Sequence, residues 1–333
     1  MRPTCDTPAV HEPHPVVDVL TERHATGSEP RARQDPHRVA LVLEGGSMRG
    51  VVSAGSTAAL ERLGLTRCFD LVVGSSAGAL NGAALISGVA GPGAAMYHGV
   101  LASRQFVNPA RLLVGRPALD VRFVLHHANK DLDPGRHERT LRSPIELHCV
   151  ALDVDSGRPH TFTGMRTIPE LAEVMLATTR MPWIGGDPVR LGDRRYVDGA
   201  LACPIPVQEA LAAGATHVLV LQTRPFGVAR TTGSPVKEWL VLRQLERINP
   251  ALAAMWRDRA AAYEALVADI AERSAQPAPS GPHVLGLRPP AGTPVVSQLE
   301  RRADRLQAGA RDGERLVEAA FGAVLERAAA VAR

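Results

Sequence analysis

Apolar runs of strand length alternate with stretches of helical spacing through the middle of the chain. The apolar runs predict strands over residues 38–43, 69–73, 145–154, 195–197 and 217–222. The segments between them predict helices over 51–63, 167–178 and 206–213, and a further helix of small residues directly after residue 74. Strands that alternate with helices indicate an α/β fold with a mainly parallel sheet covered on both faces.

The two ends of the chain differ from this pattern. Residues 1–36 are rich in Pro, His, Arg and Glu and have no apolar period, so we expect a disordered N-terminal arm before a folded domain over residues 37–333. From about residue 234 the pattern predicts helices over 236–248 and 251–273 and a short strand over 284–287. Ser297-Gln298-Leu299-Glu300 fits a capping box that opens a last helix. The apolar faces of this largely helical extension need the sheet to bury against, which favours one domain.

Composition narrows the class of protein. With 45% hydrophobic and 22% charged residues among 333, the chain can bury a sizeable core. The net charge of +4 comes from arginines scattered along the chain, without the concentrated stripe that a nucleic-acid binder shows. There is no apolar run long enough to cross a bilayer and no secretory signal, so we expect a cytoplasmic protein. The four cysteines are too far apart for a zinc site, and no metal is expected.

The stretch Gly74-Ser75-Ser76-Ala77-Gly78 fits the pattern G-x-S-x-G between a predicted strand and a predicted helix. In a nucleophile elbow the serine occupies a strained turn at this place, and its oxygen projects from the turn. The N-terminus of the following helix favours the negative charge that develops during attack. The pattern selects Ser76 as the candidate nucleophile, with a tight turn that has no chemistry as the alternative.

A glycine-rich loop, Gly45-Gly46-Ser47-Met48-Arg49-Gly50, follows the first predicted strand. Glycines allow backbone N–H groups to turn inward and form a nest for a phosphate or an oxyanion, and Arg49 adds a positive charge. A dinucleotide fingerprint would need glycine where Ser47 stands, and a P-loop would need Gly-Lys-Ser/Thr. An anion nest and a simple strand–helix turn therefore remain the two interpretations.

The third motif, Asp198-Gly199-Ala200, follows the short strand predicted over 195–197. An aspartate at such a strand end can accept a hydrogen bond from a hydroxyl, although Asp-Gly turns without a function are common. Together the three motifs would supply the nucleophile, base and oxyanion donors that acyl transfer needs.

The order and spacing of these motifs resemble the patatin-like phospholipase family. That family has a glycine-rich G-G-G-x-R/K-G loop, followed by G-x-S-x-G and later by D-G-A/G. This chain offers GGSMRG at 45–50, GSSAG at 74–78 and DGA at 198–200. The resemblance covers roughly residues 38–225 and includes the stretches 177–182 and 214–217.

The resemblance implies a three-layer α/β/α sandwich and a serine hydrolase of lipid acyl esters such as phospholipids. It implies a Ser–Asp dyad in which Ser76 is the nucleophile and Asp198 is its base. It implies no metal or organic cofactor, and a lipid or fatty-acyl ester as the binding partner. The other residues that match the motifs are Gly50, Gly74, Gly78, Gly199 and Ala200.

By the same resemblance, the backbone N–H groups of Gly45, Gly46 and Ser47 would form the oxyanion hole, supported by Arg49. The family usually has glycine at the position of Ser47. If this position needs a positive φ, serine is strained there by about 1 kcal/mol or more. This departure supports an alternative, in which the chain is a catalytically weak lipid-binding or regulatory protein of the same fold.

A second alternative is a Ser–His–acid triad esterase, in which His217 or His283 would be the base because the histidine follows the acid in the chain. A membrane surface is a further candidate partner. Trp239, Leu240 and neighbouring leucines form an apolar stripe beside basic residues, as in helices that contact membranes transiently. Packing of this stripe on its own domain is the more common outcome.

Overall fold

One eight-stranded sheet organises the computed structural model, which describes residues 14–127, 133–182, 184–230 and 235–331. The sheet has the order β5-β6-β3-β2-β1-β7-β8, and β4 pairs with β3 outside this path. The strands are β1 (Val39–Leu43), β2 (Leu71–Ser75), β3 (Glu146–Asp153), β4 (Pro159–Phe162), β5 (Val189–Leu191), β6 (Arg194–Asp198), β7 (His217–Leu221) and β8 (His283–Leu287). The five neighbours β3-β2-β1-β7-β8 are parallel, whereas β4, β5 and β6 are antiparallel. The predicted mainly parallel sheet is confirmed.

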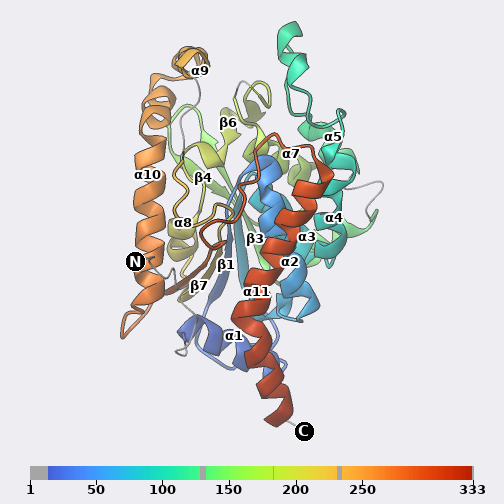
Figure 1. Ribbon diagram of the computed structural model, residues 1–333, viewed down its shortest axis with the longest axis vertical. Helices are drawn as coiled ribbons and strands as arrows, with labels where there is room; N and C mark the ends of the chain where they lie inside the picture. The colour runs from blue at the N-terminus through green and yellow to red at the C-terminus, as the bar shows by residue number, and fades with distance from the viewer. Residues whose placement is uncertain (1–13, 128–132, 183, 231–234, 332–333) are drawn as a thin grey trace.

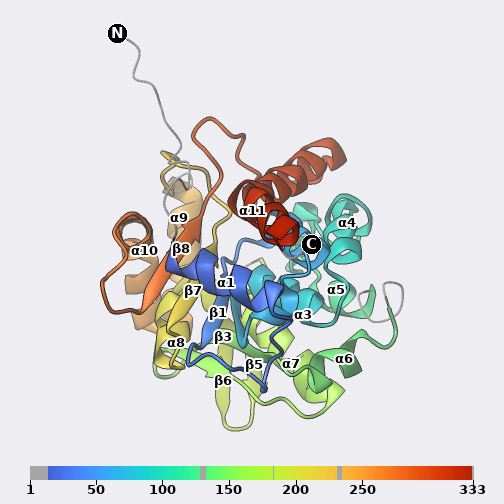
Figure 2. The ribbon, with the colours of Figure 1, turned by 90° about the horizontal axis from the view of Figure 1, so that it is seen from below.

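Helices cover both faces of this sheet, which confirms the three-layer α/β/α sandwich (Figures 1 and 2). The side chains of Ala40 and Val42 pack toward α8 and α10, and those of Leu41 and Leu43 pack toward the opposite layer. All five residues of β1 are buried, as expected for a strand covered on both faces. The helices are α1 (Pro15–Ala25), α2 (Val51–Arg62), α3 (Ala77–Ile86), α4 (Ala90–His98), α5 (Val121–His127), α6 (Arg136–Arg142), α7 (Ile168–Thr179), α8 (Val207–Ala212), α9 (Pro235–Ile248), α10 (Pro250–Ala275) and α11 (Ala303–Val331).

The last helix packs closely along α2 (Figure 1). A Cβ atom added at Gly313 would lie 1.9 Å from the carbonyl oxygen of Val52, so only glycine allows this approach. The helix begins at Ala303, not at the predicted capping box. The Ser297 hydroxyl instead accepts the N–H of Leu299 within a turn, and the 297–302 segment has no helix. The segment before it adds β8 to the sheet, so the C-terminal extension is not purely helical.

The expectation of a disordered arm over residues 1–36 is wrong for residues 14–36. Residues Pro15–Ala25 form α1, whose valines and leucine are buried against the core, and a loop then leads to β1. Residues 1–13 lie outside the described part. None of the described helices combines the length and the apolar character that spanning a bilayer requires.

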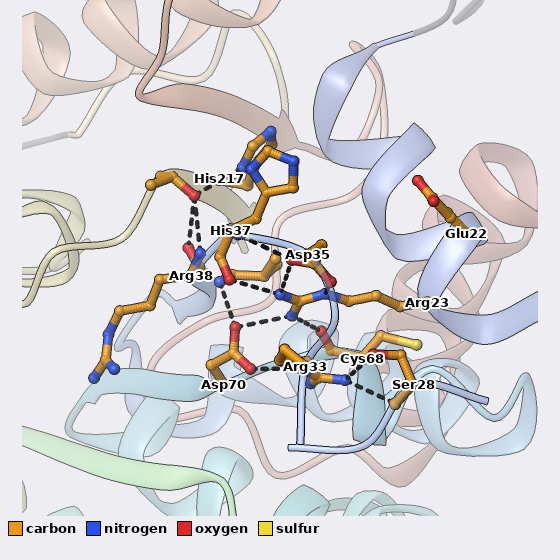
Figure 3. Close-up of polar contacts among 12 residues, drawn as sticks. Glu22, Arg23, Ser28, Arg33, Asp35, His37, Arg38, Cys68, Asp70 and His217 are labelled. Atoms are coloured by element: carbon orange, nitrogen blue, oxygen red, sulfur yellow. Dashed lines mark hydrogen bonds and ion pairs between the residues drawn. The ribbon is translucent and has the colours of Figure 1, made fainter. Parts of the chain in front are cut away.

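Two arginines, Arg23 and Arg33, tie this N-terminal segment to the start of β2 through Asp70 (Figure 3). Arg23 is 2% exposed and donates to both carboxylate oxygens of Asp35, at 2.7 and 2.9 Å, and to Asp70 at 2.8 Å. Its remaining bonds go to the carbonyl oxygens of Cys68 and His37. All five N–H groups of the guanidinium are therefore satisfied. The periodicity of the sequence misses this anchor because it depends on polar contacts over a long range.

Candidate functional site

Three loops meet at one edge of the sheet because β1, β2 and β7 are parallel and in register. Leu43 pairs with Gly74 on one side and with Leu221 on the other, so the residues that follow each strand emerge together. These are the glycine-rich loop at 45–50, the serine turn at 75–76 and the segment from Gln222 onward. In open α/β sheets, ligands bind in the crevice at this carboxyl edge.

Ser76 occupies a sharp turn between β2 and α3. Its backbone angles are φ 56° and ψ −126°, a conformation that a residue with a side chain adopts only at a cost. Its N–H donates to Oγ1 of Thr178 at 3.0 Å, and that hydroxyl donates to the carbonyl oxygen of Val150. The end of α7 therefore holds the turn in place. At Gly45, a Cβ atom would lie 3.2 Å from Cβ of Ser76, so glycine lets the two loops lie side by side.

Asp198 reaches Ser76 from an antiparallel strand. In the register of the sheet, Asp198 pairs with Ala151 of β3, and Ser75 pairs with the preceding residue, Val150. The serine Oγ donates to Oδ2 of Asp198 at 2.7 Å, and the N–H of Ala200 donates to Oδ1 at 2.8 Å. A slip of one residue in β6 would turn the carboxylate to the other face of the sheet. The structure thus brings together the two residues that the motifs singled out.

The carboxyl group of Asp198 lies almost out of contact with water, at 2% exposure. Burial raises the pKa of Asp198 from 3.8 to about 7. The hydrogen bonds from Ser76 and Ala200 and the charge of Arg230 act in the opposite direction. The difference in pKa between the aspartate and the serine hydroxyl is thereby smaller than usual. A carboxylate with a higher pKa is a stronger base, so Asp198 is better suited to accept the serine proton.

Two N–H groups of the glycine-rich loop have no partner among the residues that the structure describes. The N–H of Gly45 donates to the carbonyl oxygen of Pro204 at 3.0 Å, so it is not available to an oxyanion. The N–H groups of Gly46 and Ser47 have no hydrogen-bond partner in the described part of the chain. Ser47 has φ 52°, so the position does need a positive φ, and its buried hydroxyl has no partner among the described residues.

Arg49 lies inside the protein next to a second buried charge. Its Nε donates to Oγ1 of Thr223 at 3.0 Å, and its Nη2 lies 3.5 Å from Oε1 of Glu44. Glu44 is fully buried and also accepts from the Tyr263 hydroxyl at 3.1 Å. Burial lowers the pKa of Arg49, against the attraction of Glu44. The charge of Arg49 is therefore partly neutralised by Glu44, and Arg49 also lines the cavity described below.

The two histidines of the alternative triad lie at the other edge of the sheet. His217 opens β7 and His283 opens β8, and the two residues pair across these strands with rings 4.9 Å apart. Figure 3 shows His217 beside His37, near the Arg23 anchor. A histidine at the amino ends of these strands cannot reach a serine at their carboxyl edge, so the geometry gives the triad no support.

A cavity of about 380 Å³ opens beside Ser76 and Asp198. One group of its lining residues is apolar and includes Leu80, Leu101, Phe106, Leu119, Val124 and Ile184. A second group is polar and comprises Arg49, Arg224, Arg230, Glu238, Trp256 and Arg259. All of these polar residues except Arg49 lie outside the motifs, so the sequence analysis did not single them out. No group of three His, Cys, Asp or Glu residues that could hold a metal occurs in the described ranges.

Comparison with known proteins places this geometry in context. A curated relative, the uncharacterized protein YjjU of Escherichia coli K12, is 30% identical over 192 residues, which are 57% of this chain and 53% of the relative. The chain thus spans about half the length of that relative. Two solved structures are similar at 14% identity. VipD from Legionella pneumophila has a TM-score of 0.41, with 85% of this chain and 67% of that one covered. Human GIVD cytosolic phospholipase A2 has a TM-score of 0.42, with 95% and 63% covered.

The family assignment rests on the sequence model of the patatin-like phospholipases, which matches residues 41–211, just over half of the chain. All three motifs fall within this match. The resemblance stated from the motifs is confirmed, and the chain belongs to the patatin-like phospholipase family.

Proposed function

We propose that the chain is a serine acyl hydrolase that cleaves lipid acyl esters with Ser76 as nucleophile and Asp198 as base. The observation that supports this most is the 2.7 Å hydrogen bond between the serine Oγ and the buried carboxylate, in a strained elbow beside a cavity. The family membership supports a lipid ester as the substrate class.

In the first half-reaction Asp198 accepts the proton of Ser76 while Oγ attacks the ester carbonyl carbon. The backbone N–H groups of Gly46 and Ser47 would form the oxyanion hole and bind the negative oxygen of the tetrahedral intermediate. When the intermediate collapses, Asp198 returns the proton to the leaving alcohol, and the acyl group stays on Ser76. Water then repeats the sequence and releases the fatty acid.

Alanine substitution of the two adjacent serines gives a matched test. Ser76→Ala should abolish hydrolysis of p-nitrophenyl octanoate and labelling by a fluorophosphonate probe. Ser75→Ala should retain both, because its buried hydroxyl has no hydrogen-bond partner in the described chain. Circular dichroism would show that both variants are folded. Hydrolysis by Ser76→Ala at the parent rate would exclude the proposed nucleophile.

The alternative of a catalytically weak lipid-binding protein rests on Ser47, whose positive φ and unpartnered hydroxyl depart from a relaxed glycine loop. The fluorophosphonate probe separates the two proposals. Stoichiometric labelling of Ser76 within minutes supports the enzyme, whereas a folded protein that binds lipid but is not labelled supports the alternative.

We also propose transient contact with a membrane surface through α9. Leu245 of the apolar stripe is fully buried, but Trp239 and Leu240 are 56% and 55% exposed. Arg243 lies over the Trp239 ring at 5.3 Å. Figure 1 shows α9 at the end of the molecule opposite α1, which packs at the amino edge of the sheet. An exposed tryptophan beside an arginine is typical of surfaces that contact lipid headgroups.

A further inference from the structure

Three arginines form one wall of the cavity that Ser76 and Asp198 also line. Arg224 and Arg230 come from the segment after β7, and Arg259 comes from α10. The guanidinium carbons of Arg224 and Arg230 lie 5.5 and 5.8 Å from the centre of the Tyr263 ring. Arg259 stacks over the ring of Trp256 at 3.7 Å. These contacts hold three positive groups together around two aromatic side chains.

The positive charge of this wall is only partly compensated. Arg259 pairs with Glu238 at 2.7 Å, and Arg49 lies beside Glu44. Among the described residues neither Arg224 nor Arg230 forms an ion pair with a carboxylate, and Glu264 accepts only the main-chain N–H of Arg230. Arg224 is 9% exposed, and its Nε is buried without a hydrogen-bond partner among the described residues. Four guanidinium groups thus lie near three carboxyl groups, those of Glu44, Glu238 and Asp198.

Clustered positive charge in a partly buried site is unfavourable unless an anion joins it. Burial lowers the pKa of Arg230 to about 10, and repulsion from Arg49, Arg259 and Arg224 adds to this effect. The group remains charged at neutral pH. Guanidinium groups bind phosphate oxygens in pairs and with good geometry, which makes a phosphate the best complement to this wall.

The opposite wall of the same cavity is apolar. It is supplied by α3 and the segments after α4, which cover the face of the sheet opposite α10 (Figure 1). Ser76 and Asp198 line the cavity together with both walls. An acyl ester would therefore place its fatty chain against the apolar wall, its carbonyl carbon at Ser76, and its alcohol half toward the arginines.

We propose that Arg224, Arg230 and Arg259 form a headgroup site that selects lipids whose alcohol half carries a phosphate and a net negative charge. The substrates would then be anionic phospholipids, such as phosphatidic acid or phosphatidylglycerol, in preference to neutral acylglycerols and zwitterionic lipids. A choline group needs an open aromatic face or a carboxylate. Here Arg259 covers the Trp256 face and pairs with Glu238. This assignment rests on the proposed hydrolase function.

The test compares monomeric short-chain lipids, so that adsorption to vesicles plays no part. Hydrolysis is measured on dihexanoyl phosphatidic acid, dihexanoyl phosphatidylcholine and dihexanoylglycerol, with p-nitrophenyl hexanoate as an uncharged ester. The parent should prefer the anionic lipid. Arg230→Gln and Arg224→Gln should each lower kcat/KM for it by about tenfold, since a hydrogen bond to a charged group is worth about that factor. Activity on the nitrophenyl ester should fall less, because Arg230 acts on that reaction only through its charge beside Asp198, so the readout is the ratio of the two activities.

Two further variants make the comparison specific. Arg257→Gln is the matched control, because Arg257 lies on α10 two residues before Arg259 but is exposed and pairs with Glu246. Arg257→Gln should keep the parent's preference for the anionic lipid. Arg230→Lys should retain part of the preference that Arg230→Gln loses. If Arg224→Gln does not fold, Arg230→Gln still decides, because Arg230 is only half-buried.

The headgroup site would be overturned if the parent hydrolysed all three lipids equally, or if Arg230→Gln slowed every ester alike. Absence of nitrophenyl ester hydrolysis by the parent would instead count against the proposed function. In that case calorimetric binding to Ser76→Ala tests the site alone. Dihexanoyl phosphatidic acid should bind at least tenfold more tightly than the choline lipid. Equally tight binding of inorganic phosphate would show an anion site that does not read lipids and would overturn the inference.

Discussion

The buried carboxyl group of Asp198 should make the stability of the protein depend on pH in a way that Asp198→Asn removes. The pKa of this group is about 7 in the folded protein, whereas 3.8 is its ordinary value. Because the folded-state pKa is raised, the folded protein favours the protonated form. The stabilising contribution is complete below pH 4 and is lost as the pH rises through 7.

The size of the effect follows from the shift. Each pKa unit corresponds to about 1.4 kcal/mol, so a shift of roughly three units amounts to about 4 kcal/mol over the whole range. Between pH 5 and pH 8.5 about 3 kcal/mol of this should be lost. Asparagine does not ionise, and its amide can still accept the N–H of Ala200 and donate to Ser76.

The assay is urea unfolding of the parent and Asp198→Asn at pH 5 and pH 8.5, followed by tryptophan fluorescence. The difference between the two proteins should grow by about 3 kcal/mol in favour of the variant as the pH rises, because other titrating groups cancel. The rate of ester hydrolysis should favour the parent, in contrast to the stability. The variant should lose about 10²–10⁴-fold in rate, and the parent's rate should rise with pH through about 7. A stability difference that does not change with pH would refute the burial argument.

Three further substitutions test other parts of the structure. Ser47→Gly should keep turnover and raise the free energy of unfolding by about 1 kcal/mol, because it relieves the strain of the positive φ and removes a hydroxyl that has no partner among the described residues. Thermal unfolding and ester kinetics measure the two effects. A large loss of activity would show that Ser47 has a role of its own. Arg23→Met should cost about 3 kcal/mol in urea unfolding, because Asp35 loses its arginine partner and Asp70 keeps only Arg33. The folded fraction should hydrolyse esters normally, since Arg23 lies at the opposite edge of the sheet. Gly313→Ala should cost about 1–3 kcal/mol, since its Cβ would clash with the Val52 carbonyl, and an unchanged melting temperature would contradict the close packing of α11 on α2.

Local signals in the sequence were enough to predict the sheet and its helices. The buried strands β1, β2, β3 and β7 are mainly apolar runs, and the motifs at 45–50 and 74–78 follow the first two of them. The motifs also named Ser76 and Asp198. What they could not give is the register of β6, an antiparallel strand whose pairing with β3 brings Asp198 to the serine.

Long-range polar contacts explain what the sequence did not reveal. Helix α1 lies in a segment whose composition suggests disorder, and it is held by Arg23 through partners such as Asp70, 47 residues away. Similarly, Arg230 and Arg259 look like any other surface arginines in the sequence. Only the fold shows that they line the cavity of Ser76. Gly45 matched its motif, yet its N–H donates a hydrogen bond to the carbonyl oxygen of Pro204, which no local pattern could predict.

The position of β7 in the sheet has a consequence for folding during synthesis. One edge of β1 pairs with β2, which follows closely in the chain, but its other edge waits for β7 at residues 217–221. At ribosomal speeds of about 5–20 residues per second, that edge stays open for on the order of ten seconds or more. An unpaired edge of five apolar residues is a template for aggregation. A nascent chain of this protein is therefore exposed to aggregation during this interval, and in a fragment that stops at residue 211 this edge of β1 would stay unpaired.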